Sequence, residues 1–61
     1  MLNAYDQEAL VKSSHAASFL VQDLRDLMKS ENPLLAEMVL DLLQQAVQLE
    51  LKLKRIETLT Q

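Results

Sequence analysis

A chain of 61 residues forms one small domain at most, and a domain of this size has a marginal hydrophobic core. The absence of cysteine and glycine excludes disulfide frameworks, thiolate zinc sites and the phosphate-binding loops that depend on glycine. The net charge of −3 argues against a general attraction to nucleic acid or to anionic membranes.

The first half of the chain predicts a helix from about Asp6 to Lys29. We expect Asp6 to be its N-cap and Tyr5 to pack on Leu10. The predicted apolar stripe of this helix consists of Leu10, Ser13, Ala17, Leu20, Leu24 and Leu27. Ser13 is the one polar member of this stripe, and we expect its hydroxyl to bond back to its own helical turn. Near the end of the helix, Asp26 and Lys29 are spaced to form a surface ion pair.

The dipeptide Asn32-Pro33 predicts the start of a second helix, because asparagine caps free amides and proline suits the first helical position. We expect this helix to run from about Pro33 to about Leu59. Its apolar residues recur in steps of four and three, as in a coiled coil. They are Leu35, Val39, Leu42, Ala46, Leu49, Leu53 and Ile56. The segment 49–54 also alternates as a strand would, but its leucine, glutamate and lysine residues favour a helix.

The predicted turn, residues 30–32, is so short that the two helices must lie antiparallel. The sequence therefore predicts an all-α fold in one domain, residues 1–61, formed by an antiparallel two-helix hairpin. Many apolar residues remain outside the two stripes, so we expect two hairpins to form a homodimeric four-helix bundle. The residues expected at the oligomer or partner interface are Leu20, Leu24, Met28, Met38, Leu42, Leu43, Ala46, Val47, Leu49, Leu53 and Ile56.

No residue pattern predicts catalysis, a cofactor or a metal site. His15 shares its helix face with Val11, Ser18 and Phe19, and no carboxylate on that face could orient the imidazole ring. We expect a surface or interface histidine. A di-iron bundle would need an inward Glu-x-x-His motif, which the sequence lacks.

One basic cluster, formed by Lys52, Lys54 and Arg55, lies near the end of the second helix. Cations there are favourable because they complement the helix dipole. The alternative interpretation is a small patch that binds anions or nucleic acid.

We expect a small non-enzymatic regulatory protein, a homodimer that inhibits or chaperones another protein, like the anti-activators of phages, plasmids and bacteria. Length, two helices and one short turn also make the chain similar in architecture to the Rop family of plasmid RNA-binding proteins. That resemblance rests on architecture and on no residue motif. It implies an alternative, an RNA- or DNA-binding hairpin dimer that uses Lys52, Lys54 and Arg55.

A third interpretation is an oligomerisation module cut from a longer chain, although Met1 and the capped, length-matched helices favour a complete protein. An enzyme is the least favoured interpretation.

Charged residues interrupt the richest apolar stretch, and the amino end turns acidic at Asp6 in place of a secretory leader. We therefore expect a cytoplasmic protein.

Overall fold

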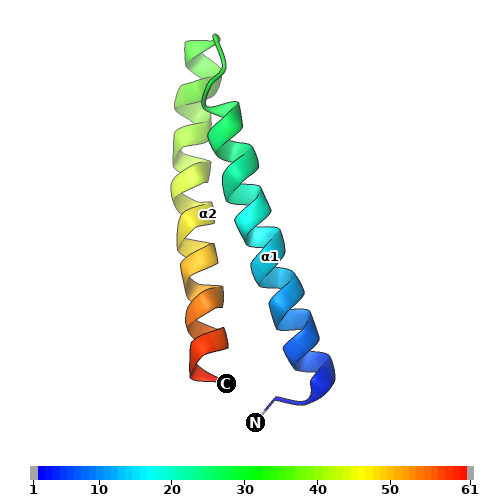
Figure 1. Cartoon of the computed structure of the whole chain (residues 1–61). Helices are drawn as coiled ribbons and strands as arrows, with labels where there is room; N and C mark the ends of the chain where they lie inside the picture. The colour runs from blue at the N-terminus through cyan, green and yellow to red at the C-terminus, as the bar shows by residue number, and fades with distance from the viewer. Residues whose placement is uncertain (1, 61) are drawn as a thin grey trace.

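The computed structural model describes residues 2–60 as two antiparallel helices joined by a short turn (Figure 1). Helix α1 spans Ala4–Leu27 and helix α2 spans Pro33–Leu59. The predicted all-α hairpin is confirmed, since α1 and α2 pack against each other. Met1, on which the expectation of a complete protein partly rests, lies outside the described residues.

Helix α1 begins earlier than the sequence pattern predicts. The N-cap is Asn3, whose Oδ1 accepts a hydrogen bond from the Asp6 N–H at 2.8 Å, so the assignment of Asp6 as the cap is wrong. Both residue types cap helices well, and the earlier cap leaves the Asp6 carboxylate in the first turn, where it complements the helix dipole. Tyr5 consequently lies inside the helix with 78% of its surface exposed, and it does not pack on Leu10 as expected.

The turn between the helices covers residues 28–32, because α1 ends at Leu27 and not at Lys29. The N–H groups of Lys29 and Ser30 donate to the carbonyls of Asp26 and Leu27, each at 3.1 Å. No residue between 2 and 60 has a positive φ. A chain without glycine can therefore make this reversal without backbone strain.

Helix α2 begins as the sequence predicts. Asn32 Oδ1 accepts hydrogen bonds from the N–H groups of Leu34 and Leu35, at 3.0 and 3.2 Å, and Pro33 occupies the first helical position. The Asn32 N–H in turn donates to Ser30 Oγ at 3.0 Å. Both backbone and side chain of Asn32 thus fix the direction in which α2 leaves the turn.

The interface between the helices is small and lies in a different register from the predicted stripes. The buried residues are Ser14, Ala17, Val21, Val39 and Ala46. On α1, the interface row uses Ser14, Val21 and Met28 in place of Ser13, Leu20 and Leu27. On α2, it uses Ala36, Leu43, Glu50 and Glu57 in place of Leu35, Leu42, Leu49 and Ile56. Each helix is therefore rotated by about 50° relative to the predicted pairing, half of the roughly 100° that separates successive residues.

The physical reason for this register is the size of the side chains at the contact. Ala17 and Ala46 belong to both the predicted and the observed interface, and each is 5% exposed. Val21 and Ala36 are smaller than Leu20 and Leu35, which they replace at the contact, so the backbones can approach closely. The hairpin is a single layer of helices, with Cα extents of 46 × 14 × 11 Å. It therefore leaves its larger apolar side chains partly in solvent.

Candidate interaction surfaces

The displaced stripe forms an apolar surface on one side of the hairpin. We call it the leucine face. It consists of Leu20, Leu27, Leu35, Leu42, Leu49 and Ile56, which are between 36% and 51% exposed. On each helix these residues directly flank the interface row, and in an antiparallel pair both flanking rows lie on the same side of the hairpin. The leucine face therefore extends over both helices.

A groove crosses the leucine face near its middle. Its volume is about 730 Å³, and its apolar lining includes Leu20, Leu24, Leu42 and Leu49, with Ala46 between the helices. Asp41 and Lys52 supply the charged groups among the lining residues. The remaining polar lining residues are Gln44, Gln45 and Gln48. The α1 residues of the lining are thus both leucines, whereas all of its charged and amide side chains come from α2.

The expected oligomer or partner residues divide into three groups by burial. Ala46 is buried between the helices. The half-buried members are Leu24, Met28, Leu43, Val47 and Leu53. The exposed members are Leu20, Met38, Leu42, Leu49 and Ile56. Four of these exposed residues belong to the leucine face, whereas Met38 lies near the turn beside the equally exposed Leu34.

The basic residues near the end of α2 do not share one face. Lys52, Lys54 and Arg55 are all exposed. Lys52 and Lys54 lie about 160° apart around the helix, whereas Arg55 lies about 60° from Lys52. Lys52 lines the groove of the leucine face. The structure therefore brings at most two of the three charges to one surface.

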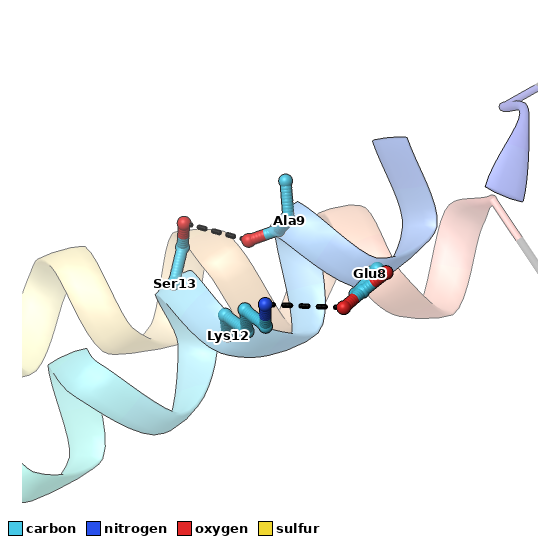
Figure 2. A network of polar contacts seen from close by, with 4 residues as sticks. All are labelled: Glu8, Ala9, Lys12 and Ser13. Carbon is cyan, nitrogen blue, oxygen red and sulfur yellow. Dashed lines mark hydrogen bonds and ion pairs between the residues drawn. The ribbon is translucent and has the colours of Figure 1, made fainter. Parts of the chain in front are cut away.

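Several polar side chains of α1 bond within their own helix. Figure 2 shows Lys12 Nζ at 3.0 Å from Glu8 Oε1 and the Ser13 hydroxyl donating to the Ala9 carbonyl at 2.8 Å. The bond predicted for Ser13 is thus confirmed. The predicted ion pair is also present, with Lys29 Nζ at 3.6 Å from Asp26 Oδ1.

His15 is exposed, as expected for a surface histidine. Over the described range, no three His, Cys, Asp or Glu side chains are grouped to hold a metal ion. Neither helix within residues 2–60 is apolar over a length that would cross a membrane.

Two carboxylates in the helix interface are features that the sequence analysis missed. Glu50 and Glu57 are half-buried and lie seven residues apart on α2, in the same interface row as Ala36 and Leu43. The Ser18 hydroxyl donates to Glu50 Oε2 at 2.6 Å. Their spacing of seven residues from each other and from Leu43 is a signal that they share the interface row. Charged residues, however, normally indicate the solvent side of a helix.

Glu57 borders a second cavity, at the open end of the hairpin. This cavity has a volume of about 420 Å³ and is lined by Gln7, Leu10 and Val11 from α1 and by Glu57 and Thr60 from α2. Figure 1 shows the two helices drawing apart toward this end. We call this cavity the open-end cleft.

The chain matches no protein-family model, no curated protein and no solved structure.

Proposed function

We propose that this chain is a non-enzymatic interaction protein that dimerises through the leucine face and, as a four-helix bundle, binds and modulates another protein. The observation that carries the proposal is the leucine face itself. Six large apolar side chains remain partly exposed on one side of the hairpin, whereas five residues of the described chain are buried. Contiguous apolar surface of this kind typically marks a site of protein association.

The exposed area of the chain supports a second copy as the occupant of the leucine face. The accessible surface is 4964 Å², whereas a compact monomer of this mass exposes about 4,000 Å². The difference, about 960 Å², is close to the ~800 Å² that each partner buries in an interface of standard size. A second hairpin has the same length and the same apolar face, so it covers the whole surface at once.

The regulatory part of the proposal rests on what the bundle leaves exposed. Leu34 and Met38 lie near the turn and are 65% and 63% exposed, outside the leucine face. Methionine adapts to irregular apolar surfaces and is common where proteins bind partners. In this proposal the bundle inhibits or chaperones its partner by covering a complementary apolar segment.

The experiment that tests the dimer is a pair of matched substitutions. Leu49 and Leu51 are 49% and 50% exposed, but Leu49 belongs to the leucine face and Leu51 does not. Leu49→Glu should give a monomer of 7.0 kDa by light scattering, because it places a charge in the proposed interface. The unaltered chain and Leu51→Glu should both give twice that mass.

Two outcomes would contradict the proposal. A monomeric mass for the unaltered chain over a dilution series would remove the homodimer. Equal dissociation by Leu49→Glu and Leu51→Glu would place the contact elsewhere. Substitution of Leu34 and Met38 by serine should leave the mass unchanged and abolish partner binding. If this variant still bound the partner, the assignment of Leu34 and Met38 to partner binding would be overturned.

A further inference from the structure

The open-end cleft combines an apolar wall with one carboxylate. Leu10 and Val11 provide the apolar wall, whereas Gln7 and Thr60 contribute an amide and a hydroxyl. Glu57 is the one charged residue of the lining. The volume of about 420 Å³ is within the range of roughly 300–1,000 Å³ that is typical of small-ligand sites.

Within residues 2–60, the ion pairs of the chain are Glu8 with Lys12 and Asp26 with Lys29. Glu57 belongs to neither pair, although it is half-buried. A carboxylate that is partly removed from water is stabilised by a cation or by hydrogen-bond donors. The chain therefore provides the cleft with a negative charge and with no cation of its own among the described residues.

Glu50, in the same interface row, is a carboxylate whose hydrogen-bond donor comes from within the chain. One heptad before Glu57, Glu50 accepts the hydrogen bond from Ser18, so its charge has a donor on the opposite helix. At the level of Glu57, α1 presents Leu10, Val11 and the neutral Gln7 amide at the cleft, and neither a hydroxyl nor a cation. An apolar residue in place of Glu57 would pack against these side chains with a smaller desolvation cost. A glutamate at this position points to a cation from outside the chain.

We infer that the open-end cleft binds one cationic side chain, a lysine or an arginine, that projects from the protein partner. The aliphatic stem of such a side chain packs on Leu10 and Val11, as the stems of lysine and arginine do on apolar surfaces. Its charged head donates hydrogen bonds to the Glu57 carboxylate and to the oxygens of Gln7 and Thr60. The inference rests on the proposed function, because it takes the side chain to come from the modulated protein.

The test uses small probes, so that it does not require the partner. Isotope-labelled protein is titrated with n-butylguanidinium and n-butylammonium, and n-butanol is the neutral control of similar length. The backbone amide signals of residues 7–11 and 57–60 should shift with both cations and stay unchanged with n-butanol. Added salt should weaken the binding of both cations, because a charge pair at a half-buried site is partly screened.

Two isosteric variants locate the charge. Glu57→Gln should weaken n-butylguanidinium binding by about fivefold or more, because it removes the negative charge and keeps the side-chain shape. Glu31→Gln makes the same chemical change in the exposed turn, at the other end of the molecule, and should leave binding unaltered. Far-ultraviolet circular dichroism checks that both variants keep the helicity of the unaltered protein.

The inference is overturned if the cations cause no shifts at the cleft, if n-butanol causes the same shifts, or if Glu57→Gln binds as tightly as Glu31→Gln. Such a failure is distinguishable from failure of the proposed function. The dimer is assessed by mass and by Leu49→Glu, and neither measurement depends on Glu57.

Discussion

Ser18 and Glu50 are joined across the helix pair, with 2.6 Å between the serine Oγ and the glutamate Oε2. In the part of the chain that the structure describes, this is the side-chain hydrogen bond that links α1 to α2. Ser18 directly follows Ala17, and Glu50 lies one helical turn beyond Ala46 toward the open end of the hairpin. The polar half of the interface is therefore held by a directional bond, whereas the half near the turn is held by apolar packing.

We expect Ser18→Ala to lower the free energy of unfolding by about 1–2 kcal/mol, because Glu50 then stays half-buried without its donor. Urea denaturation at one fixed protein concentration measures this change. Ser13→Ala is the control, since the Ser13 hydroxyl bonds to Ala9 within its own helix. It should alter the free energy of unfolding by less than about 0.5 kcal/mol. Equal losses in the two variants would show that the bond between the helices does not stabilise the hairpin.

The alanine layer at the centre of the interface is sensitive to charge. Ala46 is 5% exposed, and Ala46→Asp would bury an unpaired carboxylate between the helices. We expect a loss of about 3 kcal/mol or more, which would remove most of the helical circular dichroism of so small a protein. Ala16→Asp introduces the same side chain at an exposed position of α1 and should cost about 0.7 kcal/mol of helix propensity. An unchanged melting temperature for Ala46→Asp would contradict the burial of Ala46 between the helices.

The two N-caps, Asn3 and Asn32, should differ in how much they stabilise the folded protein. Asn32→Ala removes the acceptor for the N–H groups of Leu34 and Leu35, and we expect a loss of about 1 kcal/mol. Asn3→Ala removes the acceptor for the Asp6 N–H at the free end of α1, where fraying is least costly, and should have a smaller effect. Thermal unfolding of the two variants compares them directly. A larger loss for Asn3→Ala would mean that the open end, and not the turn, governs stability.

The basic residues near the end of α2 are expected not to bind nucleic acid. Lys52 and Lys54 point about 160° apart, and the chain carries a net charge of −3. Fluorescence anisotropy with labelled RNA and DNA should therefore show no binding at moderate salt. Binding that weakens steeply with salt and is lost in a variant with glutamine at positions 52, 54 and 55 would favour the nucleic-acid function instead.

The fold follows from local signals in the sequence, whereas the interface register does not. Asparagine is a good N-cap and proline suits the first helical position, so Asn32 and Pro33 allow the start of α2 to be predicted. The register depends on a choice between two adjacent rows of side chains on each helix. Leu42 is as hydrophobic as Leu43, and the sequence of one chain does not state which of the two faces the other helix. The structure resolves that choice in favour of the small side chains, which permit the closer approach.

The sequence predicts some residues of the candidate surfaces but not the open-end cleft. Leu20, Leu42 and Leu49 were assigned to an interface, and their partial exposure leaves them available for one. The open-end cleft could not be predicted, because it arises where two segments distant in sequence draw apart. The position of Glu57 at its edge has no local signature.

The thickness of the hairpin has a consequence for its lifetime in the cell. A layer 11 Å thick between Cα extremes gives each helix one neighbour within its own chain, so the proposed dimer supplies the second. The melting temperature should then rise with protein concentration. Newly made copies would be open to proteases until they meet, and the protein would accumulate only above a threshold rate of synthesis. Such a dependence would make the amount of the proposed dimer a steep function of its own expression.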